Sequence, residues 1–155
     1  MTTIRVLYFL EDMGHERFVT GLVDRMASKR ELEVIHDVRN RGGGAARAME
    51  QLEKLVRKIK KYEAGVPPFD LLVVVMDANC DGPTLRRKQI DAATAGAGLE
   101  TRIVEGVPNP HIERWLLLQP RAVKSAVNWA EGYNLPEQKC DKELYKNLLG
   151  GVNLF

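Results

Sequence analysis

The residues of this sequence best suited to chemistry are carboxylates that follow apolar segments. They are Glu11, Asp12, Asp77, Asp81 and Glu113, and the amide Asn79 lies between two of them. Carboxylates gathered at one place repel each other unless a cation or a proton relieves them, and hard oxygen ligands suit Mg²⁺ or Mn²⁺. Such an ion binds one or two carboxylates together with phosphate oxygens of a substrate. We therefore expect a divalent metal site that acts on phosphate groups.

The densest acidic stretch runs from Asp77 to Gly82. Asp77, Asn79 and Asp81 are two residues apart, so that a turn can direct alternate side chains at one point. The same residue types also form turns for purely local reasons, and this alternative stays open. A calcium-binding EF-hand loop does not fit, because its twelfth position requires Glu and here holds Lys88.

Alternating strands and helices are expected to bring these residues together. Apolar runs typical of strands lie at residues 4–10, 32–38, 70–76 and 101–107, and helical patterns follow them from residues 16, 45, 84 and 112. This alternation indicates βαβ units and a parallel sheet. We expect an α/β fold of the Rossmann-like kind, with a central, mostly parallel sheet of about four strands flanked by helices. Ligands of such sheets bind outside the carboxyl ends of the strands, where the acids lie.

Two of the expected helices have further local signals. The face formed by Phe18, Leu22 and Met26, with Val19 and Val23 beside them, is expected to turn inward. Thr84 is expected to cap the helix that follows the acidic stretch.

Length and composition indicate one ordinary domain. The chain has 155 residues, of which 45% are hydrophobic and 28% charged, as is typical of a globular protein. We expect a single domain over residues 1–155, with a core at about 4–118 and a helical C-terminal extension at 119–155.

The sequence also indicates the compartment. The apolar run Leu71–Met76 is too short to cross a bilayer, and the N-terminus does not resemble a signal peptide. The two cysteines, Cys80 and Cys140, have no metal-ligand spacing and are expected to be reduced. These features predict a cytoplasmic protein without a membrane partner.

Three segments together resemble motifs of the TOPRIM superfamily, in particular small stand-alone TOPRIM-like proteins of bacterial defence systems. The first is the strand that ends in Glu11, followed by a helix that bears Glu16. The second is the stretch from Asp77 to Gly82, and the third is Pro108–Leu117. The resemblance covers roughly residues 4–118 and implies a TOPRIM-like domain.

The resemblance implies a role for each matching residue. Glu11 would act as a general acid/base or ligate a metal, and Asp77 would be the principal Mg²⁺ ligand. Glu113 would contribute a further carboxylate, while Glu16 and Asp12 would support the site.

At one position the chain departs from the family pattern. The second aspartate of the family lies two residues after the first, where this sequence has Asn79, a neutral oxygen ligand. Asp81 would have to supply the missing charge. The expected metal ligands are therefore Asp77, Asn79, Asp81 and Glu113, and the expected ion is Mg²⁺ or Mn²⁺.

Basic residues follow the acidic stretch directly. We expect Arg86, Arg87 and Lys88 to contact the phosphates of a nucleic acid, with DNA the first choice. A second basic run, at residues 54–61, is expected to be a solvated helix face. The glycine-rich segment at residues 41–44 could cradle a phosphate, but a turn is the favoured interpretation.

The histidines are expected to have structural roles. His15 and His111 lie near acids of the expected site, but they lack zinc-type spacing, so we expect capping or surface positions. His36 lies within an expected strand.

These expectations combine into one leading hypothesis and two rivals. The leading hypothesis is a Mg²⁺-dependent TOPRIM-like nuclease or phosphotransferase acting on nucleic-acid phosphodiesters, with an ATPase partner in phage or plasmid defence. The second is a non-catalytic TOPRIM-like binding module, which Asn79 favours. The third is a receiver-like or flavodoxin-like domain, ranked last because no fifth strand carries the lysine that a receiver needs. Whether the chain forms a homodimer stays open.

Overall fold

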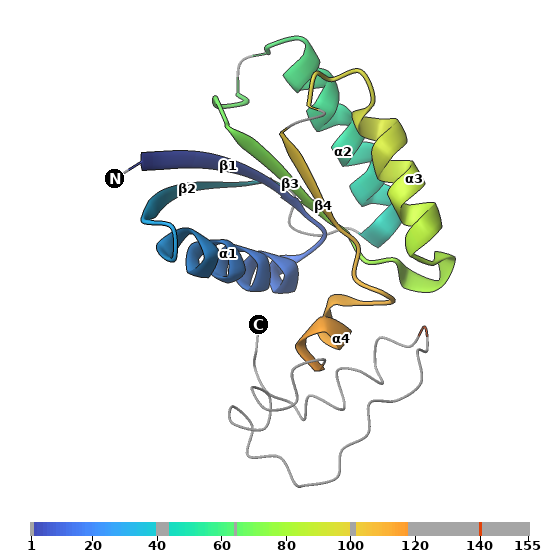
Figure 1. Cartoon of the computed structure of the whole chain (residues 1–155). Helices are drawn as coiled ribbons and strands as arrows, with labels where there is room; N and C mark the ends of the chain where they lie inside the picture. The colour runs from blue at the N-terminus through green and yellow to red at the C-terminus, as the bar shows by residue number, and fades with distance from the viewer. Residues whose placement is uncertain (1, 40–43, 64, 100–101, 118–139, 141–155) are drawn as a thin grey trace, which may run out of the picture.

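The computed structural model describes residues 2–39, 44–63, 65–99, 102–117 and 140. Strands and helices alternate along them (Figure 1). The strands are β1 (Thr2–Leu10), β2 (Leu32–Arg39), β3 (Leu71–Val75) and β4 (Ile103–Gly106). The helices are α1 (Met13–Ser28), α2 (Gly44–Lys60), α3 (Pro83–Thr94) and α4 (Ile112–Leu117), with the short 3-10 helix η1 (Asn79–Asp81) before α3. The predicted α/β architecture is confirmed.

The four strands form one parallel sheet in the order β2-β1-β3-β4. β1 and β3 are the central strands, and Leu10 pairs with Val75 at their carboxyl ends. Since β2 and β3 lie on opposite sides of β1, the chain first turns toward one edge of the sheet and then crosses to the other. Such a switch point is where open α/β sheets bind ligands.

Alternating side chains of the central strands build two apolar layers, because successive residues of a strand point to opposite faces. Leu7 and Phe9 of β1 belong to the layer that packs against α2 and α3. Val6, Tyr8 and Leu10 belong to the layer that packs against α1 and α4. Figure 1 shows the same division, with α2 and α3 on one face of the sheet and α1 on the other. Both faces of β1 are therefore covered over its carboxyl half, Val6–Leu10, as the apolar sequence there predicts, whereas Thr2, Thr3 and Arg5 are exposed.

The starts of two helices depend on local signals. Asp12 has extended backbone and caps α1, and its side chain accepts a hydrogen bond from the backbone N–H of His15. The predicted cap of α3 was wrong, since Gly82 occupies that position with a φ of 83°. Glycine tolerates this positive φ, and Pro83 fits the first helical position because it has no N–H to satisfy. Thr84 consequently lies inside the helix.

The predicted apolar face of α1 is buried only in part, since Val19 is in the core and Phe18 and Val23 pack against it. Val19 and Ala27 are buried, whereas Leu22 and Met26 remain 45% and 49% exposed. Both exposed side chains line an apolar pocket between α1 and the sheet. A periodic apolar pattern predicts a helix, but it does not predict how much of the helix surface a neighbouring element buries.

Cys80 and Cys140 are joined in a disulfide. The expectation of two reduced cysteines was therefore wrong, because a separation of 60 residues gives no sign of proximity. Apart from Cys140, the predicted extension at 119–155 lies outside the described residues, as do residues 41–43 of the glycine-rich segment. Among the helices that the structure describes, none combines the length and apolar character needed to cross a membrane.

Candidate metal centre

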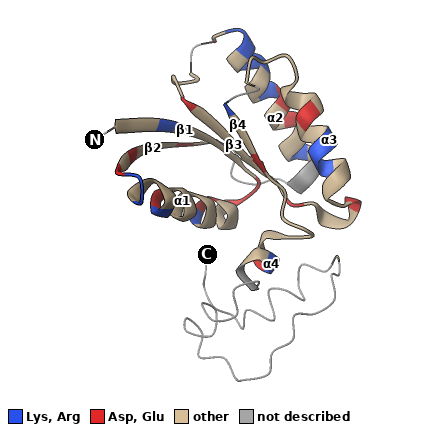
Figure 2. Ribbon diagram, in the orientation of Figure 1, with Lys and Arg blue, Asp and Glu red and all other residues tan. Residues whose placement is uncertain are grey.

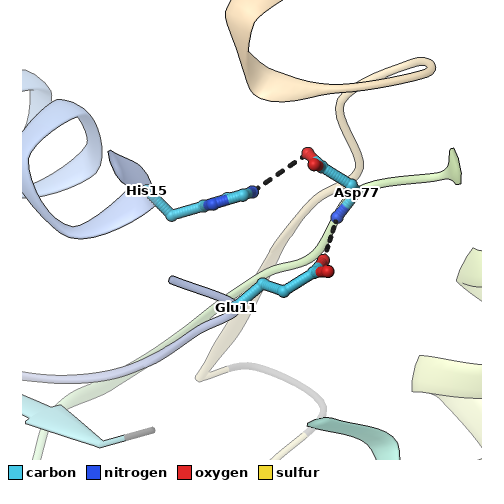
Figure 3. A group of neighbouring side chains, drawn as sticks. All are labelled: Glu11, His15 and Asp77. Atoms are coloured by element: carbon cyan, nitrogen blue, oxygen red, sulfur yellow. Dashed lines mark hydrogen bonds and ion pairs between the residues drawn. The ribbon is translucent and has the colours of Figure 1, made fainter. Parts of the chain in front are cut away.

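The centre lies where the central strands β1 and β3 end. Glu11 directly follows β1, and its backbone N–H donates to the carbonyl of Val75 at 3.3 Å. The backbone N–H of Asp77 donates in turn to Glu11 Oε2 at 2.9 Å (Figure 3). Asp77 is fully buried and Glu11 is 8% exposed. The two acids singled out from the sequence are therefore in direct contact.

The Asp77 carboxylate accepts contacts from three other elements of the chain. His15 Nε2, from α1, lies 3.0 Å from Oδ1, and His111 Nδ1 lies 3.3 Å from Oδ2. The backbone N–H of Ile112 at the start of α4 donates to Oδ1 at 2.9 Å. Both histidines are buried. These contacts stabilise the buried charge of Asp77, because a buried carboxylate without hydrogen bonds or counter-charges would strongly destabilise the fold.

His15 connects Asp77 with Asp12. Its Nδ1 lies 2.7 Å from Asp12 Oδ1, while its Nε2 faces Asp77. Burial alone would lower the pKa of His15, but the hydrogen bonds and charges of Asp12 and Asp77 outweigh it and raise that pKa to about 9. At neutral pH the imidazolium therefore offsets part of the negative charge of the cluster.

Glu11, His15 and Asp77 could together hold a metal ion. Each offers one ligand atom, and these atoms lie within 4.8 Å of one another (Figure 3). Carboxylate oxygens suit Mg²⁺ and Mn²⁺, and an imidazole nitrogen is a common ligand of transition metals. The prediction of a metal site at these strand ends is thus supported by the placement of Glu11 and Asp77.

Asn79 and Asp81 contact groups other than the carboxylates of Glu11 and Asp77. Asn79 has a φ of 51°, a left-handed conformation that asparagine tolerates, and its side-chain N–H donates to the carbonyl of Asp77 at 3.4 Å. The side chain of Asp81 is 56% exposed and lies 3.7 Å from Arg86. The structure therefore supports the turn-forming alternative for these two residues.

Glu113, Glu16 and Asp12 surround the group. Glu113 is buried in the first turn of α4, directly after the Ile112 amide that binds Asp77. Glu16 is half-buried in the first turn of α1, directly after His15. Asp12 holds the far nitrogen of His15. The position of Asp12 beside His15 is compatible with its predicted supporting role, and Glu113, predicted as a metal ligand, does not belong to the group of Glu11, His15 and Asp77. The roles of Glu113, Glu16 and Asp12 stay predictions.

The three basic residues expected at nucleic acid have different environments. Arg86 is only 3% exposed, and its Nε donates to the carbonyl of Asp77 at 3.0 Å while its Nη1 donates to Gln89 at 2.8 Å. Arg87 and Lys88 are exposed on α3. Arg86 thus belongs to the framework of the centre, which leaves Arg87 and Lys88 for phosphate contacts. The other basic run gathers toward the C-terminal end of α2, uppermost in Figure 2.

Sequence reasoning missed two residues of the centre. His15 and His111 were expected to be capping or surface residues, whereas both are buried against Asp77. The available signal was weak: each histidine stands a few positions from an acid of the expected site, and neither belongs to a metal-binding spacing.

Comparison with known proteins does not assign this chain to a family. No protein-family model, curated protein or solved structure matches the chain significantly. The TOPRIM resemblance thus remains an expectation that depends on the three sequence segments alone.

Proposed function

We propose that this protein is a divalent-metal-dependent nuclease or phosphotransferase that acts on nucleic-acid phosphodiesters, with Mg²⁺ or Mn²⁺ as the ion. One observation carries the proposal: Glu11 and Asp77, from the ends of the two central strands, meet His15 in one compact group. This group lies at the switch point of the sheet, where α/β folds bind their ligands. DNA as the nucleic acid, and an ATPase as the partner in defence, are parts of the proposal that depend on the resemblance.

Glu11, His15 and Asp77 would hold the ion, which would neutralise the charge that develops on the phosphate during cleavage. Asp77 is fixed by the Ile112 amide and by Arg86 on its carbonyl, so its carboxylate is oriented before any ligand arrives. The alternative role of Glu11, which is 8% exposed, would be to take a proton from an attacking water while His15 and Asp77 hold the ion. Arg87 and Lys88 would hold the backbone of the nucleic acid by its phosphates.

The test is nicking of supercoiled plasmid by the full chain, with Mg²⁺ or Mn²⁺ and with chelator. We expect metal-dependent nicking by the wild type and none by Glu11→Gln or Asp77→Asn. Glu53→Gln is the matched control, because it removes an acid from the exposed surface of α2. Circular dichroism identifies any variant that fails to fold. Nicking that survives in both folded site variants would refute this mechanism.

A non-catalytic binding module is the second candidate function, and two observations favour it. Asn79 and Asp81 stand outside the metal-binding group, and Asp77 is fully buried. This candidate predicts nucleic-acid or partner binding that persists in chelator and in Asp77→Asn. A gel-shift titration and plasmid nicking, each with and without chelator, distinguish the two candidates. Chelator should abolish nicking by the enzyme, whereas it should leave nucleic-acid binding by the module unchanged.

A further inference from the structure

The side chains that face Asp77 are nitrogen donors rather than the oxygen donors expected from the sequence. His15 Nε2 lies 3.0 Å from one carboxylate oxygen of Asp77, and His111 Nδ1 lies 3.3 Å from the other. All three side chains are at least nine-tenths buried. The centre thus offers imidazole nitrogens and carboxylate oxygens at close range, a donor set that the spacing of the acids alone did not indicate.

These distances fit neighbouring ligands of one ion. In an octahedral site with metal–ligand bonds of about 2.1 Å, adjacent ligand atoms lie about 3.0 Å apart and opposite ones about 4.2 Å apart. The His15–Asp77 distance is close to the first value. The ligand atoms of Glu11, His15 and Asp77 all lie within 4.8 Å of one another, a range that includes both values. An ion could therefore replace the contact between His15 and Asp77 with only small side-chain movements.

The far side of the His15 ring is fixed as in known metal sites. Histidines that ligate metals typically donate their other ring N–H to a carboxylate, which sets the ring orientation and the tautomer. Asp12 Oδ1 lies 2.7 Å from His15 Nδ1 and also accepts the backbone N–H of His15 at 3.0 Å. An ion that binds here displaces the proton shared between Nε2 and Asp77 and releases it to solvent. With the remaining proton on Nδ1, the lone pair of Nε2 points at the position beside Asp77.

We infer that this is a mixed nitrogen–oxygen site for a divalent transition ion, with His15 and Asp77 as central ligands. Glu11 completes it, Asp12 positions His15, and His111 contacts the other carboxylate oxygen of Asp77. Imidazole nitrogen suits transition ions, whereas Mg²⁺ takes oxygen ligands and keeps several of its waters. The inference deepens the proposed function, because it assigns the kind of ion that the same site selects.

The first test uses the wild-type chain, stripped with chelator and loaded with Mn²⁺ alone. Pulsed electron paramagnetic resonance detects a nitrogen nucleus bound to Mn²⁺ through its modulation of the electron spin echo. We expect this nitrogen signal, and we expect it to persist in a large excess of Mg²⁺. A bound Mn²⁺ without nitrogen modulation, or one displaced by an equal amount of Mg²⁺, would overturn the inference. This spectrum needs no variant that might fail to fold.

Variants locate the nitrogen. His15→Asn should weaken Mn²⁺ binding by about tenfold or more and remove its nitrogen signal, and Asp12→Asn should weaken it by about tenfold. His36→Asn is the matched control, because His36 contacts Tyr8 and Asp24 away from the centre. Its binding should equal that of the wild type, and an equal loss in His36→Asn would overturn the assignment.

Plasmid nicking in the same samples separates this inference from the proposed function. Nitrogen modulation without nicking would support the transition-metal site and refute the nuclease. Mg²⁺-dependent nicking without nitrogen modulation would support the nuclease and refute the nitrogen ligands.

Discussion

Replacing His15 with asparagine should remove most of the pH dependence of stability between about pH 6 and about pH 9. The pKa of His15 is about 9 in the folded chain and about 6.5 in an unfolded one. A histidine with a raised folded-state pKa contributes stability that is fully present below about pH 6.5 and is lost as the pH rises through about 9. The difference corresponds to about 3 kcal/mol of unfolding free energy.

Urea denaturation followed by circular dichroism measures this free energy at each pH, with chelator present so that no metal occupies the centre. The wild type should lose about 3 kcal/mol from about pH 6 to about pH 9. His15→Asn should be much less stable than the wild type at the acid end, and the two should converge at the alkaline end. Asp12→Asn, which removes one of the two carboxylates at the ring, should give an intermediate slope.

Parallel curves for the wild type and His15→Asn would refute the reasoning. Such a result would mean that His15 is not charged in the folded chain, and that Asp12 and Asp77 are neutralised by another group. The sign is also informative: a wild type that gains stability with rising pH would show that burial, which lowers the pKa, outweighs the carboxylates.

Three further predictions concern the framework of the centre and its surroundings. Arg86→Ala should cost about 1–3 kcal/mol in urea denaturation, because the buried carbonyl of Asp77 loses the shorter of its contacts and keeps the 3.4 Å contact from Asn79. Arg87→Ala, at an exposed position, should stay within about 0.5 kcal/mol. Replacing both Arg87 and Lys88 with alanine should lower the salt dependence of nucleic-acid binding by about two in the log–log slope, measured by fluorescence anisotropy; an unchanged slope would place the phosphates elsewhere. Cys80→Ser should destabilise the oxidised chain by about 4 kcal/mol, the loop-closure entropy expected for a separation of 60 residues. In reductant the wild type and the variant should be equally stable, because neither then has the disulfide.

The sheet could be predicted because each strand has a local signature. β1 and β3 are continuous apolar runs, and acids mark the ends of both. Since carboxyl ends of parallel strands lie at one edge, Glu11 and Asp77 could be placed together without knowing the register. The histidines around them could not be placed in this way, because His15 and Asp77 are 62 residues apart and no local pattern connects them.

The conformation of the acidic stretch after β3 was hard to predict from the sequence for a different reason. A spacing of two residues directs side chains to one point only if the turn between them has a suitable shape, and η1 with its left-handed Asn79 gives the backbone a different shape. The buried position of Arg86, by contrast, could have been predicted from the sequence, although Arg86 was expected at the phosphates of a nucleic acid. It precedes the buried Ile90 and Thr94 at intervals of four, so all three lie on the inward face of α3.

The loop that carries His111 continues the hydrogen bonding of the sheet beyond its strands. The backbone N–H groups of Ala78 and Asn79 donate to the carbonyls of Pro108 and Pro110 at 2.8 and 2.9 Å. The N–H groups of Asp77 and Ile112 donate to carboxylates. In hydrogen exchange, these four amides should behave as part of the sheet rather than as loops. The ligand-bearing segments would then open only together, so the spacing of the donor atoms persists through local fluctuations that free an ordinary loop.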